Sequence, residues 1–141
     1  MRIFKLTLYL TLLFTVKLYS NIDNGKVYVV ANKSLKIDSL RQSTLVKIFV
    51  GKKVMYNNFP IHLVLKENKK LFLNEVLKMS HQLFDRRWKR LVYTGQKKIY
   101  ITSQSDEITI EEILKNPGGI GFVTDKSKLS KDVVLIKITD K

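Results

Sequence analysis

The stretch Lys26-Val27-Tyr28-Val29-Val30-Ala31-Asn32 gives the first indication of the fold. Its β-branched and aromatic residues form an almost continuous apolar run, which predicts a strand buried on both faces of a sheet. Residues 40–50 predict a helix, because Leu45, Ile48 and Phe49 fall at helical spacing and Gly51 can act as its C-terminal cap. This strand and this helix form the first unit of an α/β fold.

A second strand and two helices are predicted next. Residues 59–65 are apolar and form a strand with Pro60 at its entry. Ser80 is expected to cap a helix on which Phe84, Trp88 and Leu91 share one face. Before it, Asn68 is expected to cap a helix that carries the apolar residues Leu71, Phe72, Val76, Leu77 and Met79.

The last third of the chain continues the alternation. Residues 98–102 predict a third strand, and residues 106–114 predict a helix with Ile110, Ile113 and Leu114 facing inward. Two further short strands are expected at 120–123 and 133–138. Strands that alternate with helices predict one α/β domain whose mixed, mostly parallel sheet is flanked by helices.

Residues 1–20 have the order of an export signal. Arg2 and Lys5 precede the uncharged apolar stretch 6–16, which is shorter than the roughly 20 residues of a membrane-spanning helix. We therefore predict a signal peptide over 1–20, a mature domain over 21–141 and a periplasmic location. The alternative is a buried amphipathic or edge element of the domain itself. The absence of cysteine excludes disulfides and a lipid-anchored cysteine.

Composition limits the class of partner. The chain of 141 residues is 45% hydrophobic, enough for one core, and has a formal net charge of +14. Such a field attracts anions such as phosphate, nucleic acid or acidic envelope polymers. A general lysine bias that keeps the protein soluble is the alternative interpretation. An export signal makes nucleic acid the least expected of these partners.

Patterns typical of catalysis are absent from the sequence. It has no Gly-x-Ser-x-Gly elbow, no phosphate-cradling loop and no metal-ligand cluster, so no enzyme, cofactor or metal is predicted. His62 and His81 lack evident carboxylate partners and are assigned to packing or the surface. The acidic residues of the last predicted helix are assigned to a solvated face that suits the helix dipole, namely Asp106, Glu107, Glu111 and Glu112.

Two basic segments remain. Arg86, Arg87, Lys89 and Arg90 surround Trp88, but the periodicity places Trp88 in the core and leaves an ordinary basic outer face. The turn 66–70 enters a predicted helix, where unpaired backbone N–H groups and adjacent lysines can attract a small anion. Its candidate anion-binding residues are Asn68, Lys69 and Lys70.

Four segments, in order along the chain, resemble the substrate-binding proteins of phosphate ABC transporters, and especially their short single-lobe relatives. They are Val29-Val30-Ala31-Asn32, Ser39-Leu40 with Leu45 to Lys52, Met79-Ser80 with Trp88 and Leu91 to Gly95, and Asn116 to Val123. The resemblance implies a single lobe of the periplasmic-binding-protein type. At the turn where that family carries Ser-Gly-Thr, residues 66–70 have neither a glycine nor a hydroxyl side chain.

The resemblance implies an exported, non-enzymatic domain that binds phosphate or a similar small anion at the entrance formed by residues 66–70. An alternative stays open: a module that has the fold without the ligand and contacts a membrane sensor, a transporter or an acidic envelope component. In either case the sequence predicts no cofactor.

Overall fold

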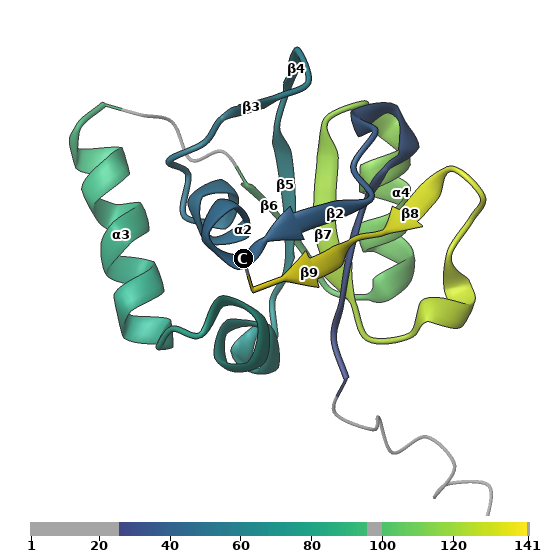
Figure 1. The fold of residues 1–141 in the computed structure, drawn as a ribbon. Helices are drawn as coiled ribbons and strands as arrows, with labels where there is room; N and C mark the ends of the chain where they lie inside the picture. The colour runs from purple at the N-terminus through teal and green to yellow at the C-terminus, as the bar shows by residue number, and fades with distance from the viewer. Residues whose placement is uncertain (1–25, 96–99, 141) are drawn as a thin grey trace, which may run out of the picture.

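A computed structural model describes residues 26–95 and 100–140, and it is built around a five-stranded sheet (Figure 1). The strand order is β6-β5-β7-β1-β8. The predicted export signal lies outside the described residues, so residues 1–20 stay a prediction. None of the described helices combines the length and the apolar character needed to cross a membrane.

Strand β1 (Tyr28–Asn32) lies inside the sheet, as predicted from its apolar run. Val29, Val30 and Ala31 are buried, and the strand pairs with β7 on one side and β8 on the other. Both pairings are antiparallel. The strand was therefore predicted correctly, and its direction is the exception within the sheet.

The other four strands run in one direction, which confirms the mixed, mostly parallel sheet. Strand β5 (His62–Lys66) lies between β6 (Tyr100–Ser103) and β7 (Gly119–Val123) and is parallel to both. Strand β8 (Val133–Leu135) is antiparallel to β1 and so runs in the same direction as these three. The carboxyl ends of β5, β6 and β7 therefore meet at one edge of the sheet, which we call the carboxyl edge.

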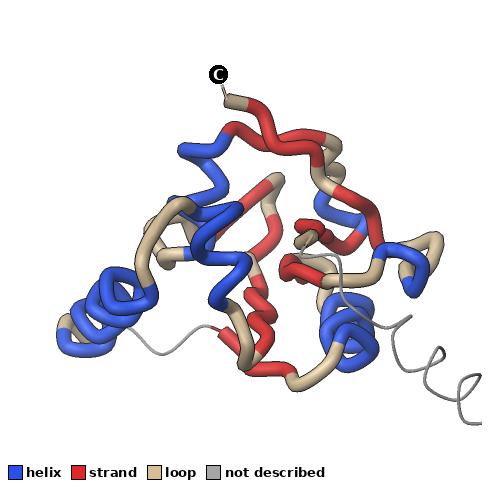
Figure 2. The backbone as a smooth tube through the Cα atoms, turned by 90° about the horizontal axis from the view of Figure 1, so that it is seen from below, coloured by secondary structure: helices blue, strands red, loops and turns tan. Residues whose placement is uncertain are grey.

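Helices cover both faces of the sheet (Figure 2). Successive residues of β5 pack against them in turn. Leu63 and Leu65 pack on the side of α2 (Gln42–Phe49), whereas Val64 packs against α4 (Asp106–Lys115). This period of two is that of a strand with both faces buried. The α/β fold with a helix-flanked sheet is thus as predicted.

Helix α3 (His81–Tyr93) packs on α2 through the segments that the resemblance identified. The Trp88 indole N–H donates to the Phe49 carbonyl at 3.2 Å, and both side chains are buried. Gly51 has φ +77°, and a Cβ there would lie 2.7 Å from Leu91. Ser80 caps α3 by accepting from the Leu83 N–H, as predicted. The residues of these segments therefore determine how α3 packs against α2.

The helical segment after β5 differs from its prediction. It starts at Lys70 and continues as a π-helical stretch, η2 (Phe72–Leu77), which ends at Lys78 in the left-handed region. Asn68 makes no capping hydrogen bond to the described residues. Met79 is buried beyond the helix end. Phe72 drives the arrangement, because it packs between the rings of Phe49 and Phe122 at centroid distances of 4.8 and 4.2 Å.

Two predicted strands are each divided in the structure. Residues 59–65 give β4 (Phe59–Pro60), which pairs with β3 (Met55–Tyr56), and then β5. Residues 133–138 give β8 and then β9 (Lys137–Thr139), which leaves the central sheet and pairs in parallel with β2 (Ser39–Arg41). The breaks fall at Ile61 and Ile136, whose buried side chains lie between two pairings. Two short 3₁₀ turns complete the chain, η1 (Lys33–Leu35) and η3 (Lys126–Lys128).

Helix α4 lies close against the sheet because glycines line its contact. A Cβ on Gly119 would lie 2.7 Å from the Ile113 carbonyl oxygen, and one on Gly121 would lie 3.3 Å from Thr109 Cγ2. Ile113 is fully buried, as expected, but Leu114 is 42% exposed. The prediction of an inward Leu114 was wrong, because only a narrow stripe of this helix touches the sheet.

Candidate functional site

The carboxyl edge gathers polar side chains from three neighbouring strands. Lys66 ends β5, Ser103 ends β6, and Thr124 follows β7 directly. In α/β proteins, ligands bind in the crevice outside the carboxyl ends of the strands. This edge is therefore the candidate functional site, and it has a closed part and an open part.

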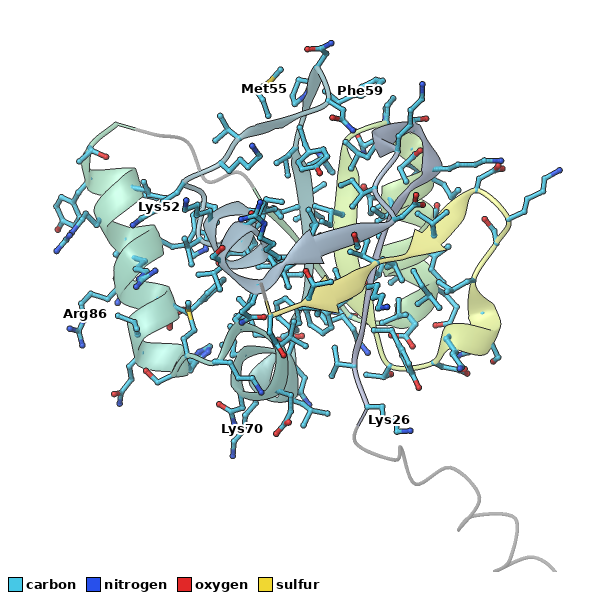
Figure 3. The ribbon with its side chains drawn as sticks, viewed as in Figure 1. Lys26, Lys52, Met55, Phe59, Lys70 and Arg86 are labelled. Atoms are coloured by element: carbon cyan, nitrogen blue, oxygen red, sulfur yellow. The ribbon has the colours of Figure 1, made fainter. Side chains whose placement is uncertain are left out.

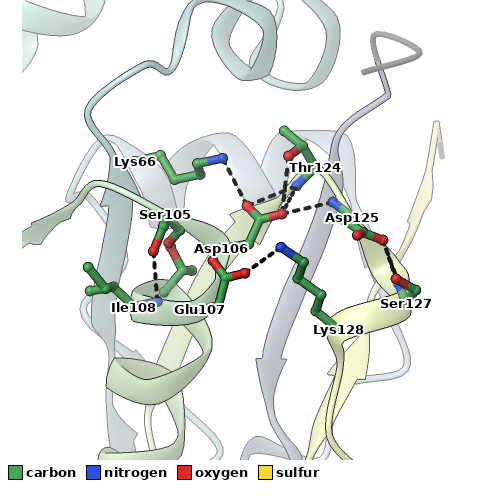
Figure 4. Close-up of polar contacts among 10 residues, drawn as sticks. Lys66, Ser105, Asp106, Glu107, Ile108, Thr124, Asp125, Ser127 and Lys128 are labelled. Carbon is green, nitrogen blue, oxygen red and sulfur yellow. Dashed lines mark hydrogen bonds and ion pairs between the residues drawn. The ribbon is translucent and has the colours of Figure 1, made fainter. Parts of the chain in front are cut away.

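The closed part is an ion pair between Lys66 and Asp106 (Figure 4). The Lys66 ammonium lies 2.8 Å from Asp106 Oδ1, and the two side chains are 15% and 6% exposed. Asp106 Oδ2 also accepts from the Asp125 N–H at 2.9 Å, and from the N–H and the hydroxyl of Thr124, both at 3.1 Å. One carboxylate thus joins the ends of β5 and β7 to the start of α4.

These contacts set the ionisation of Asp106. Burial alone would raise the pKa of this carboxyl, but the hydrogen bond from Lys66 and the backbone N–H groups of Asp125 and Thr124 outweigh it and hold the pKa below its usual value. Asp106 is therefore charged at neutral pH. Its charge neutralises Lys66, which leaves that ammonium unsuited to hold an external anion.

Hydroxyl groups complete this part. Ser103 Oγ and Thr109 Oγ1 lie 2.6 Å apart, and both residues are buried. Thr109 Oγ1 also donates to the Ser105 carbonyl, while Ser105 Oγ caps α4 by accepting from the Ile108 N–H. Each of these side chains has its partner within the fold, so the closed part is structural.

The open part contains the three predicted anion-binding residues. Asn68, Lys69 and Lys70 follow β5 and line a shallow hollow of about 400 Å³. Asn68 and Lys70 are exposed, and Lys69 is half-buried. Lys70 projects from the lower rim of the molecule in the view of Figure 3. The other lining residues, which the sequence did not single out, are Glu67, Asn74, Ser80 and His81.

Charge is unbalanced in this hollow. Within the part of the chain that the structure describes, neither Lys69 nor Lys70 lies in an ion pair, whereas Lys66 does. Glu67 is the single acidic residue of the lining. Two ammonium groups against one carboxylate give a weak net attraction for an anion.

Solved structures share this fold, and the chain covers slightly less than half of each of the three that follow. A protein assigned as a phosphate ABC transporter substrate-binding protein from Clostridium perfringens, solved with bound phosphate, superposes with a TM-score of 0.62 at 15% identity, covering 81% of this chain and 45% of that one. PstS from Borrelia burgdorferi gives 0.58 at 16% identity, with 82% and 47% covered. An ABC-type phosphate transport receptor from Vibrio cholerae gives 0.52 at 18% identity, with 79% and 45% covered.

The chain has the fold of phosphate-transport substrate-binding proteins. It spans less than half the length of each of these neighbours, as expected of a single-lobe relative. No family model matches the sequence, and no curated protein does. The likeness therefore rests on the arrangement of the elements, and the resemblance found in the four sequence segments agrees with it.

On this phosphate-binding-protein fold, the acidic residues of α4 have two roles. Glu107 pairs with Lys128, and Glu111 and Glu112 lie beside Lys115 at 3.2 and 3.5 Å, all at the surface. They form the solvated face that was predicted. Asp106 was assigned to the same face, and that assignment was wrong because this residue is 5% exposed and points toward Lys66.

The two histidines differ from each other. His81 lies 3.3 Å from Asp85, one helical turn further along α3, so it does have the carboxylate partner that was not expected. His62 starts β5, and its Nε2 is buried without a hydrogen-bond partner among the described residues. Residues 26–95 and 100–140 also contain no group of three side chains that could hold a metal ion.

Proposed function

We propose that this protein is an exported, non-enzymatic domain of the solute-binding type that binds phosphate or a similar small anion at Asn68, Lys69 and Lys70. The observation that carries the proposal is the hollow at the carboxyl end of β5, where two lysines lack an acidic partner among the described residues. The bound phosphate in the Clostridium perfringens neighbour supports a small anion as the ligand class.

Binding would depend mainly on the two ammonium groups and the amide of Asn68. Lysine is a point charge with three donors and suits the oxygens of a phosphate. Backbone N–H groups in the first turn of a helix lack intrahelical partners and can orient an anion. The helical segment begins at Lys70, which also lines the hollow, so the N–H groups of its first turn would lie beside the lysines.

Affinity in this arrangement would be low. The hollow is shallow and solvent-filled, and charge pairs in water are worth only about 1 kcal/mol or less. The described chain covers the anion from one side. A partner protein or a second copy would have to exclude water before the same lysines could bind an anion tightly.

Export forms part of the proposal. Residues 1–20 would direct the chain across the membrane and be removed, leaving residues 21–141 in the periplasm. The Clostridium perfringens and Vibrio cholerae neighbours are phosphate-transport proteins, which supports phosphate as an anion that an exported relative would meet. That these neighbours are substrate-binding proteins and receptors also supports a binding role without catalysis.

Calorimetric titration with inorganic phosphate tests the proposal. We expect saturable heat that exceeds the heat with sulfate, and about a fivefold weaker affinity in Lys69→Ala, which corresponds to the loss of one exposed charge contact. The control is Lys131→Ala, which removes an exposed lysine that does not line the hollow. Absence of heat, or equal heat with both anions, would contradict anion binding at this hollow.

A second candidate function is a module that contacts a membrane sensor, a transporter or an acidic envelope component without any small ligand. Residues 66–70 favour it, because they lack glycine and hydroxyl side chains and because Lys66 is already neutralised by Asp106. A calorimetric titration without heat, for a correctly folded chain, would make this the better proposal.

A further inference from the structure

Arginine is concentrated in a single helix. The chain has 21 Lys and only 5 Arg, yet Arg86, Arg87 and Arg90 all lie in α3. A general bias toward lysine cannot explain this choice. Arginine differs from lysine in its planar guanidinium, which binds phosphate oxygens in pairs.

The lysine and arginine side chains of α3 have no acidic partners within residues 26–95 and 100–140. Asp85 lies beside His81, and none of Arg86, Lys89 and Arg90 forms an ion pair there. All three are exposed. Their charges are therefore not neutralised by an ion pair within the described fold and can bind an external anion.

Packing fixes the direction in which these charges point. Phe84 and Trp88 are buried on the inner side of α3, and the Trp88 indole N–H donates to the Phe49 carbonyl at 3.2 Å. Residues on the opposite side of the helix must face solvent. Figures 1 and 2 place α3 as the outermost element on its side of the sheet, and Figure 3 shows Arg86 pointing away from the molecule.

Apolar surface lies next to these arginines. At the end of α3, Tyr93 is 92% exposed and Val92 is 52% exposed. Beside them, a hollow of about 370 Å³ is lined in part by Trp88, Val92 and Tyr100. Exposed aromatic and aliphatic side chains next to cationic ones are typical of surfaces that enter the headgroup region of a bilayer.

The charge distribution would orient the whole molecule. Helix α3 carries four Lys and Arg and one Asp, whereas α4 carries one Lys and four Asp and Glu. An anionic surface would therefore attract α3 and repel α4.

We propose that the outer face of α3, formed by Arg86, Lys89, Arg90 and Tyr93, is a docking surface for an anionic phospholipid bilayer. A phospholipid presents a phosphate beside apolar chains, and this surface presents arginines beside a hollow that aromatic and aliphatic side chains line together with Asp85 and Lys89. A nucleic-acid backbone would satisfy the charges but would leave the aliphatic side chain of Val92 without an apolar contact. The surface is separate from the hollow at Lys69, so this proposal does not depend on anion binding there.

Vesicle binding by the full chain tests the proposal. Vesicles of phosphatidylcholine alone give the baseline, which includes any insertion of the apolar segment 6–16, and vesicles with about one third phosphatidylglycerol give the signal. The double variant R86Q/R90Q is compared with K131Q/K137Q, which removes the same charge from exposed lysines outside α3. Because one basic residue near an anionic membrane is worth about fivefold in affinity, we expect R86Q/R90Q, which removes two, to lose at least about tenfold and the control much less.

Two further measurements separate the outcomes. Tyr93→Ser is expected to weaken binding to the anionic vesicles while keeping its salt dependence, because it removes apolar contact and no charge. Circular dichroism of each variant is the control for correct folding. Equal losses in the two double variants would overturn the proposal in favour of net charge alone. A loss confined to single-stranded DNA binding, with vesicle binding unchanged, would overturn it in favour of a nucleic acid.

Discussion

Lys66 and Lys69 lie three residues apart after the same strand, and their ammonium groups are in opposite situations. Lys66 is 15% exposed and lies 2.8 Å from a buried carboxylate, whereas Lys69 lines an open hollow without an ion pair in the described part of the chain. A lysine whose charge is neutralised within the fold stabilises the fold, and a lysine without such a partner can bind an external anion. One edge of the sheet thus has a structural part and a part that we propose binds an anion.

The largest effect is expected from Asp106→Ala in the structural part. The change leaves the Lys66 ammonium and the N–H groups of Thr124 and Asp125 without their acceptor in a mostly buried place. We expect the free energy of unfolding to fall by about 2 to 3 kcal/mol in urea denaturation. Glu107→Ala is the control, because its exposed carboxylate lies on the same helical turn, and it should lose only a small fraction of that. Equal losses would show that the buried pair has no special role.

Replacing each of the two lysines by glutamine in turn tests whether their roles differ. Lys66→Gln should lower the free energy of unfolding by about 1 kcal/mol, since Asp106 keeps its backbone donors, and should leave phosphate affinity unchanged. Lys69→Gln should leave stability within about 0.5 kcal/mol and weaken phosphate binding. Urea denaturation and calorimetry on both variants check this. Loss of phosphate binding in Lys66→Gln at unchanged stability would mean that the closed and open parts are assigned the wrong way round.

A smaller effect should appear in the pH dependence. The pKa of Asp106 is lower in the folded protein than its value of about 3.9 in an unfolded chain, so its contribution is fully present above that value. The contribution is lost as the pH falls through the lower, folded pKa. The difference in unfolding free energy between the natural chain and Asp106→Asn should therefore be constant above about pH 5 and shrink below pH 4. A difference that grows on acidification would contradict the assigned charge state.

Local patterns were sufficient to predict most of the elements. The run 26–32 is too apolar for anything except an internal strand, and the spacing of Phe84 and Trp88 correctly placed both in the core. What local patterns could not give is strand direction and strand division. β1 runs against its neighbours, and residues 133–138 divide at Ile136, because both features depend on partners far along the chain.

Local patterns singled out only the open part of the candidate site, and anion binding there stays a prediction. Lys69 and Lys70 stand out as adjacent charges at a turn, and they do line a hollow. Asp106 stood among other acidic residues at a helix start, where the helix dipole is a sufficient reason for a carboxylate. Its partner Lys66 lies 40 positions away, so no local signal distinguishes Asp106 from Glu107. Only the parallel pairing of β5 with β6, which brings the start of α4 to the end of β5, reveals the pair.

The most direct test of the division of the carboxyl edge is a titration of the isotope-labelled chain with phosphate, followed by backbone amide shifts. We predict saturable shifts centred on residues 68–71, with little change at Asp106, Thr124 and Asp125, and a smaller response to sulfate. Shifts centred on Thr124 and Asp125 would contradict the division, because an anion would then have to displace the carboxylate of Asp106. Absence of saturable shifts anywhere along this edge would contradict the proposed binding function itself.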